Sequence, residues 1–67
     1  MNNRLEEIRK LRNITQEQLA VDLEVSRQTI SSLEKGRYNP SILLAFRLAR
    51  YFDMAIEDIF IYEEDAT

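Results

Sequence analysis

The chain has 67 residues, of which 45% are apolar and 31% are charged, with one Gly and one Pro. This length fits one domain and excludes two, because domains rarely have fewer than about 50 residues. The composition provides enough apolar side chains for a core and differs from that of disordered chains. A domain of this size hides only about 60% of the surface that its unfolded chain exposes, so self-association would add stability.

The absence of Cys and His excludes several kinds of site. Without Cys there is no disulfide framework or thiolate metal site, which favours a reducing cytoplasm. Without His there is no imidazole triad and no histidine-ligated zinc, so we expect no metal and no cofactor. The longest apolar run, Ile42 to Phe46, is far shorter than the roughly 18 to 20 residues that cross a bilayer. We therefore expect neither a membrane span nor an export signal.

Charge is distributed unevenly along the chain, although the net charge is only −3. Residues 1–50 hold all nine Lys and Arg and six acids, whereas residues 51–67 hold six acids and no base. Such asymmetry is typical of a basic body with an acidic end. The simpler interpretation of that end is a solvated tail that aids solubility.

The first predicted helix follows Asn3 and runs to Arg12. Asn3 with Glu6 three residues later resembles a capping box, and Asn13 can take the left-handed conformation that ends a helix. Apolar residues recur at helical spacing between these ends, at Leu5, Ile8 and Leu11.

The next two predicted helices begin with capping residues of their own. Thr15, with a glutamine three residues later, opens a helix over residues 16–23. Ser26 is a good N-cap for a helix over residues 27–35, which Gly36 is placed to end.

A fourth helix is predicted after Pro40 and Ser41, and a short fifth one after Asp53 and Met54. The fourth has an apolar stripe made of Ile42, Ala45, Leu48, Ala49 and Phe52. The fifth has Ile56, Ile59 and Phe60, and residues 60–62 could extend as a strand. No other stretch alternates as a strand does, so the predicted fold class is all-α, with a short C-terminal strand as an option.

Only Glu24 and Val25 separate Leu23 from Ser26. Two helices joined by so short a turn must cross steeply, which is helix-turn-helix geometry.

The outer face of the helix over residues 27–35 suits the edges of DNA bases. With its apolar residues turned inward, Gln28 and Ser32 point outward, Ser31 and Lys35 lie beside them, and Arg27 lies on the flank. Gln can pair with adenine, Arg with guanine and Ser with either base. The simpler interpretation is that any surface helix has a polar outer face.

The chain resembles the Cro/CI-type (XRE) helix-turn-helix family in three runs, residues 15–20, 25–30 and 33–36. Ile8-Arg9, Asn39-Pro40-Ser41, Leu48-Ala49 and the run 57–60 also match the family pattern, so the resemblance covers nearly the whole chain. Very small dimeric bacterial repressors are most similar. The resemblance implies one compact five-helix, lambda-repressor-like domain over residues 1–67, with the helix-turn-helix at about 16–35. It also implies a homodimeric repressor that binds a near-palindromic operator.

The resemblance also implies roles for individual residues. Base reading falls to Arg27, Gln28 and Ser32, with Thr29 and Ser31 as helpers. Contacts to the DNA backbone fall to Thr15 and Gln16 at a helix start, where unpaired N–H groups face an anion, and to Lys35, Arg37, Tyr38 and Asn39 in the loop. Arg9 and Glu34 are expected to form an internal ion pair.

Two further expectations concern the turn and the dimer. Many family members have Gly where this chain has Glu24, which costs roughly 1 kcal/mol if the position is left-handed. The expected dimer interface is the apolar end of the chain, made of Met54, Ile56, Ile59, Phe60, Ile61 and Tyr62, with Leu44 and Tyr51 as spare candidates. Alternatively, these residues close the protomer core.

Two other functions are compatible with parts of the sequence. An antitoxin-like module would bind a partner protein through its tail and regulate its own operon, but few residues follow Phe60. An enzyme could use adjacent carboxylates such as Glu6 and Glu7, but neighbours on a helix point about 100° apart and cannot converge on one atom.

Overall fold

Five helices and two short strands make up the computed structural model, which describes residues 1–37 and 39–62. In chain order the elements are β1 (Asn2–Asn3), α1 (Leu5–Leu11), α2 (Gln16–Leu23), α3 (Arg27–Glu34), α4 (Ile42–Phe52), α5 (Ile56–Ile59) and β2 (Phe60–Ile61). The predictions for Tyr38 and for the acidic residues at 63–65 fall outside the described residues. In this described part, no helix is long and apolar enough to span a membrane.

Three predicted helix starts are confirmed by their caps. Thr15, Ser26 and Ser41 each accept, through the side-chain oxygen, a hydrogen bond from the backbone N–H three residues further on. These bonds satisfy N–H groups that have no partner within the helix. The starts of α2, α3 and α4 are therefore set by local sequence.

The predicted capping box at α1 is wrong. Arg4 is the N-cap and makes no side-chain cap bond, while Asn3 lies in β1. The Asn3 Oδ1 atom still accepts from the Leu5 N–H at 3.0 Å, but its amide nitrogen donates to the Leu33 carbonyl at 2.7 Å. A distant tertiary contact thus takes the place of the local reciprocal bond.

Several helices end at a left-handed residue. Asn13, Glu24 and Asp53 have φ values of 57°, 59° and 54°, and Gly36 follows α3 with a φ of 71°. The predictions for Asn13, Gly36 and Glu24 are confirmed. At Glu24, a residue with a Cβ therefore carries a cost of about 1 kcal/mol.

The core gathers apolar residues from all five helices and from β2. It consists of Leu5, Ile8, Leu19, Ala20, Leu23, Ile30, Leu33, Leu44, Ala45, Leu48, Ala49, Phe52, Ile59 and Phe60.

Two expected stripe residues lie outside this core. Leu11 and Ile42 are 74% and 77% exposed. Three residues turn a helix by about 300°, so residues spaced by three drift by about 60° at each step. Two such steps separate Leu11 from Leu5 and Ile42 from Leu48, which turns both exposed side chains about 120° away from those buried residues. On α1, Arg9 is buried in place of Leu11.

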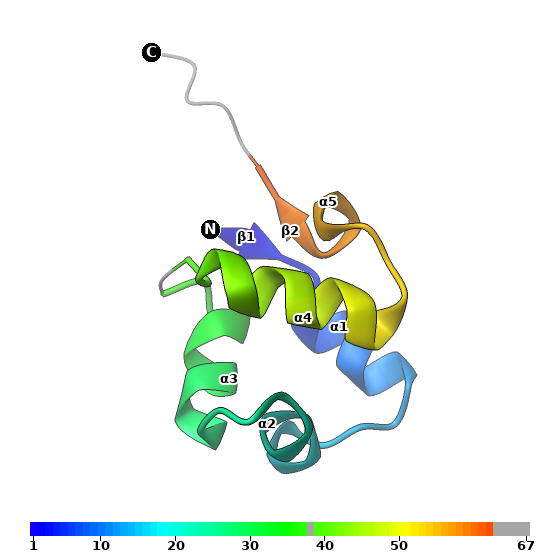
Figure 1. Ribbon diagram of the computed structural model, residues 1–67, viewed down its shortest axis with the longest axis vertical. Coiled ribbons are helices and arrows are strands. Elements are labelled where there is room, and N and C mark those ends of the chain that lie inside the picture. The colour runs from blue at the N-terminus through cyan, green and yellow to red at the C-terminus, as the bar shows by residue number, and fades with distance from the viewer. Residues whose placement is uncertain (38, 63–67) are drawn as a thin grey trace.

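The two strands pair antiparallel, with Asn2 opposite Ile61 and Asn3 opposite Phe60. The optional C-terminal strand is thus confirmed for Phe60–Ile61, and Phe60 belongs to it rather than to α5. The sheet lies at one end of the molecule, with α4 between it and α2 (Figure 1). This places the ends of the described chain away from α2.

Candidate nucleic-acid interface

The helix α3 presents a polar edge to solvent. Its apolar residues Ile30 and Leu33 are fully buried, because they pack in the core beneath the helix. Arg27 and Gln28 are exposed, and Thr29, Ser31 and Ser32 are half-buried. The helix lies at the margin of the molecule, beside α2 (Figure 1).

Two long side chains of this edge are available to a ligand. Among the described residues, Arg27 and Gln28 have no side-chain hydrogen bond or ion pair. Both line a hollow of about 270 Å³ together with Gln16 and Ser31, so α2 and α3 share this surface. A guanidinium and an amide placed in this way can donate to base edges in a groove.

Thr29 differs from the other base-reading candidates. Its backbone N–H donates to the Ser26 Oγ atom at 3.0 Å, and the two hydroxyl oxygens lie 2.8 Å apart. Its hydroxyl therefore lies at the N-cap of α3.

The start of α2 lies alongside α3. The Thr15 hydroxyl accepts the Gln18 N–H at 3.0 Å, and the Gln16 amide donates to Glu34 at 2.9 Å. Arg9, Thr15, Gln16, Glu17 and Arg27 line one hollow of about 400 Å³ there. A helix N-terminus beside the exposed Arg27 guanidinium can attract a phosphate, whereas the charge of Arg9 is already matched by Glu34.

The predicted ion pair between Arg9 and Glu34 is present and buried. The Arg9 Nε atom lies 2.6 Å from Glu34 Oε2, and the two side chains are 9% and 3% exposed. Arg9 also donates to the Ile14 carbonyl at 2.8 Å. Because Gln16 donates to the same carboxylate, this cluster joins α1, the start of α2 and the end of α3.

The loop after α3 carries further basic and polar side chains. Lys35, Arg37 and Asn39 are exposed. The Arg37 N–H donates to the Ser32 carbonyl at 3.1 Å, so the loop begins as a continuation of the helix end.

The structure corrects part of the predicted dimer interface. Ile59 is fully buried and Phe60 is 6% exposed, because both pack in the protomer core. Ile61 and Tyr62 are exposed, whereas Met54 and Ile56 are half-buried against that core.

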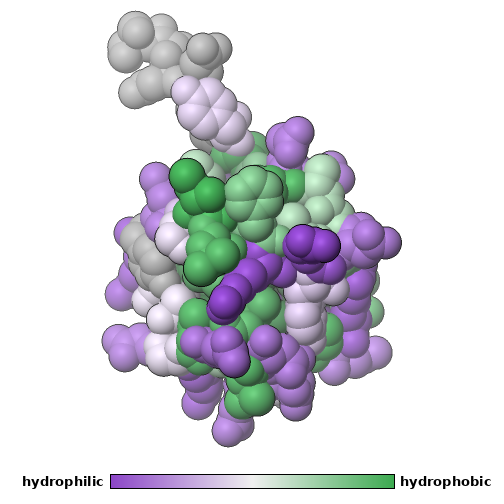
Figure 2. Space-filling view, viewed as in Figure 1, coloured by the Kyte–Doolittle hydropathy of each residue, from purple (hydrophilic) through white to green (hydrophobic). Residues whose placement is uncertain are grey.

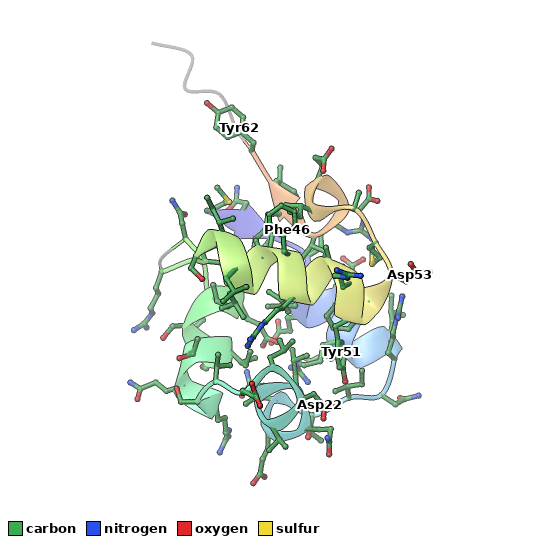
Figure 3. The ribbon with its side chains drawn as sticks, in the orientation of Figure 1. Asp22, Phe46, Tyr51, Asp53 and Tyr62 are labelled. Atoms are coloured by element: carbon green, nitrogen blue, oxygen red, sulfur yellow. The ribbon has the colours of Figure 1, made fainter. Side chains whose placement is uncertain are left out.

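The spare candidates also belong to the protomer. Leu44 is buried, and the Tyr51 hydroxyl donates to Asp22 Oδ2 at 2.6 Å, which ties α4 to α2 (Figure 3). This hydrogen bond raises the pKa of Tyr51, and burial and the Asp22 charge raise it further. Sequence patterns had no signal for this contact.

Comparisons with known proteins decide the family. A family model described as helix-turn-helix matches residues 5–59. The chain belongs to the XRE-type helix-turn-helix family. An HTH-type transcriptional regulator of Methanocaldococcus jannaschii is 58% identical over 65 residues, which are 97% of this chain and 98% of that protein. Another, of Archaeoglobus fulgidus, is 52% identical over 97% of this chain and 92% of that protein.

The fold agrees with this assignment. A transcriptional regulator from Listeria innocua has a solved structure that matches with a TM-score of 0.76 at 24% identity. The match covers 100% of this chain and 66% of the Listeria innocua protein, and it shows that the two chains share a fold. This member of the helix-turn-helix family is a DNA-binding transcriptional regulator, and the family is not enzymatic.

Proposed function

We propose that this regulator is a homodimeric repressor, which places α3 in the major groove of a near-palindromic operator. The observation that carries the proposal is the outer edge of α3, where Arg27 and Gln28 are exposed and have no side-chain partner among the described residues. With Ser31 and Ser32 they present donors and acceptors of the kind that read base edges. Bound there, the dimer would occlude a promoter.

Contacts on either side of α3 hold the helix on the duplex. Thr15 and Gln16 offer a helix N-terminus to one phosphate, and Lys35, Arg37 and Asn39 face the next turn of the backbone, with Tyr38 as a further candidate. The Arg9–Glu34 pair fixes α1, α2 and α3 as one body, so both sets of contacts act together. Such contacts provide affinity, whereas the outer edge of α3 provides selectivity.

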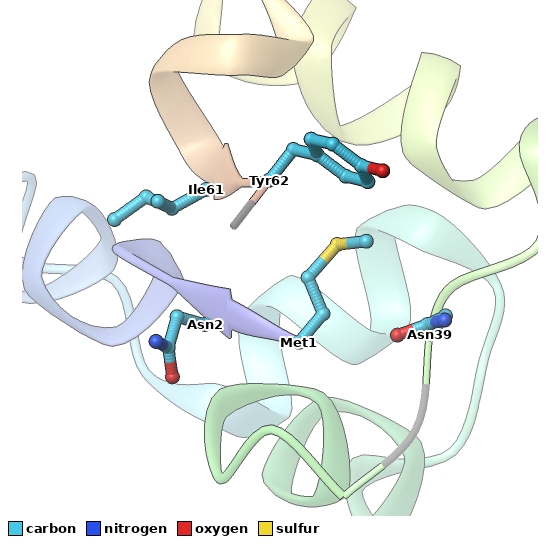
Figure 4. Close-up of a pocket in the computed structure, with 5 residues that line it drawn as sticks. All are labelled: Met1, Asn2, Asn39, Ile61 and Tyr62. Carbon is cyan, nitrogen blue, oxygen red and sulfur yellow. The ribbon is translucent and has the colours of Figure 1, made fainter. Parts of the chain in front are cut away.

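The dimer face in this proposal lies at the sheet end of the molecule. An apolar hollow of about 410 Å³ is lined mainly by Met1, Pro40, Ile42, Ala45, Phe46, Ile56 and Phe60. Phe46 and Tyr62 are exposed beside it, and apolar side chains gather over α4 and toward β2 (Figures 2 and 3). Met1, Asn39 and Tyr62 also line a smaller adjoining hollow (Figure 4).

A second copy is the occupant that DNA geometry favours for this face. One recognition helix reads a few base pairs, whereas a two-fold dimer presents two helices about 34 to 36 Å apart, one DNA turn. An apolar face rimmed by polar residues is typical of an interface.

The DNA test compares variants on operator and unrelated duplexes across salt concentrations. We expect log affinity to fall with log salt by about 0.9 for each phosphate contact. Gln28→Ala should change base preference by about 1 to 3 kcal/mol at one position. Its control is Gln18→Ala, because Gln18 bonds Asp22 on the α4 side of α2. An unchanged preference in Gln28→Ala would show that α3 does not read bases.

Arg37→Ala tests the loop. It should weaken binding to all duplexes about equally and lower the salt slope by about one contact. Arg50→Ala removes the same charge from the last turn of α4 and should leave the slope unchanged.

The dimer test is sedimentation across protein concentrations. Wild type should sediment as a dimer and Phe46→Glu as a monomer. Leu11→Glu is the matched control, because Leu11 is an exposed apolar residue on α1. A monomeric wild type, or a second protein that co-purifies on this face, would contradict the homodimer.

A further inference from the structure

The strand β1 lies against the C-terminal end of α3. The Asn3 amide nitrogen donates to the Leu33 carbonyl at 2.7 Å, and the Met1 nitrogen donates to the Gly36 carbonyl at 3.3 Å. Approach is close, because a Cβ on Gly36 would lie 3.0 Å from the Met1 oxygen. Residues 1–3 therefore contact both the last turn of α3 and the start of the loop that follows it.

The same strand also contacts the C-terminal part of the described chain. Asn3 pairs with Phe60 in the sheet, and the Arg4 N–H donates to the Ile59 carbonyl at 2.7 Å. Met1 lines both hollows of the proposed dimer face (Figure 4). β1 thus connects the end of α3 with the surface on which we place the second copy.

We propose that Asn3 is a positioning residue for DNA reading. It holds the C-terminal end of α3 and the loop from Lys35 at one place relative to the sheet. This inference rests on the proposed function, because it concerns how two α3 helices of a dimer meet two half-sites. Asn3 itself touches no base, since its amide and its Oδ1 atom are both bonded within the protomer.

The reason is the small tolerance of base contacts. A binding group must be held within about 0.5 Å of its productive position. If the bond to Leu33 is lost, α3 samples other positions, and the apparent affinity falls by the fraction that remains competent. One hydrogen bond corresponds to a factor of roughly two to ten. In a dimer both helices must be competent at once, so the two factors multiply.

Two substitutions separate this bond from the other contact of Asn3. Asn3→Asp keeps an acceptor for the Leu5 N–H but has no N–H to donate to Leu33. Asn3→Ser is neutral and also keeps an acceptor, but it is too short to reach Leu33. Asn2→Asp adds the same charge at the neighbouring exposed position and serves as the control.

Each protein is titrated with the operator and with an unrelated duplex at a temperature where circular dichroism shows it folded and sedimentation shows it dimeric. Relative to Asn2→Asp, Asn3→Asp should bind the operator about fourfold to a hundredfold more weakly and the unrelated duplex within about threefold. Asn3→Ser should show the same changes in affinity for the two duplexes relative to wild type. If Asn3→Asp does not fold, the affinities of Asn3→Ser alone test the inference.

Two outcomes are distinguishable. If both Asn3 variants bind the operator as tightly as their references, Asn3 has only a structural role and the inference is overturned. If wild type prefers no duplex at all, the proposed function fails instead.

Discussion

Replacing Arg9 by Met should remove a large part of the stability of the domain. The variant loses hydrogen bonds to Glu34 and Ile14 and leaves a carboxylate that is 3% exposed without its cation. Breaking a buried ion pair from one side costs about 3 to 5 kcal/mol. A 67-residue domain has a total stability of about 3 to 10 kcal/mol. The melting temperature should therefore fall by about 15 to 40 °C.

Removing both charges should cost much less. In Arg9→Met with Glu34→Leu, no uncompensated charge remains in the core, and apolar side chains of similar size fill the space. We expect the double variant to be more stable than either single variant and to lie within about 2 kcal/mol of wild type. Gln16, which donates to Glu34, then turns to solvent.

The assay is urea unfolding followed by far-UV circular dichroism, with melting curves as a second measure. Lys10→Met is the control, because Lys10 pairs with Glu6 at 3.6 Å on the surface, where both side chains are more than half exposed. That pair should contribute less than about 1 kcal/mol. If Arg9→Met costs no more than Lys10→Met, or if the double variant costs the sum of the single ones, the reasoning is refuted.

The remaining predictions concern two contacts and one turn. Tyr51→Phe should cost about 1 kcal/mol. The Asp22 bond raises the pKa of Tyr51, so the folded state holds the phenol proton more tightly than the unfolded state does. The stabilisation from this bond should be fully present below about pH 10, where an unperturbed tyrosine titrates, and should be lost as pH rises through the pKa of the folded state. Tyr51→Phe should not show this loss. Urea unfolding between pH 7 and 11 tests this. Glu24→Gly should raise stability by about 1 kcal/mol, seen as a higher melting temperature, since Gly takes a φ of 59° without strain; a lower one would contradict this. Gly36→Ala should be less stable than wild type in the same assay, because residue 36 has a φ of 71° and the added Cβ would meet the Met1 oxygen. Unchanged stability would show that the residues around Met1 move to accommodate the Cβ.

Sequence patterns predicted the parts of the fold that depend on neighbouring residues. The caps at Thr15, Ser26 and Ser41 and the left-handed end at Asn13 are local interactions of a few residues, so their signals lie in short runs. The Arg9–Glu34 pair is not local, and only the family resemblance indicated it.

The errors arose where distant residues compete with local ones. Asn3 forms a strand with Phe60 and bonds Leu33, so it does not cap α1. The sequence pattern around Ile59 and Phe60 is that of a short C-terminal run of exposed apolar residues. In the structure both residues are buried in the core, because Phe60 pairs with Asn3 in the sheet next to Ile59. The bond between Tyr51 and Asp22 joins two helices whose separation no periodicity encodes.

The pairing of β1 with β2 has a consequence for biosynthesis. Asn2 and Asn3 are synthesised before the five helices, but their partners Phe60 and Ile61 are synthesised after them. Contacts between neighbouring helices can form earlier, whereas the sheet can form only after Ile61 has been synthesised. Prematurely terminated chains would thus lack the strand that seats the N-terminal residues, which leaves them recognisable to quality-control proteases.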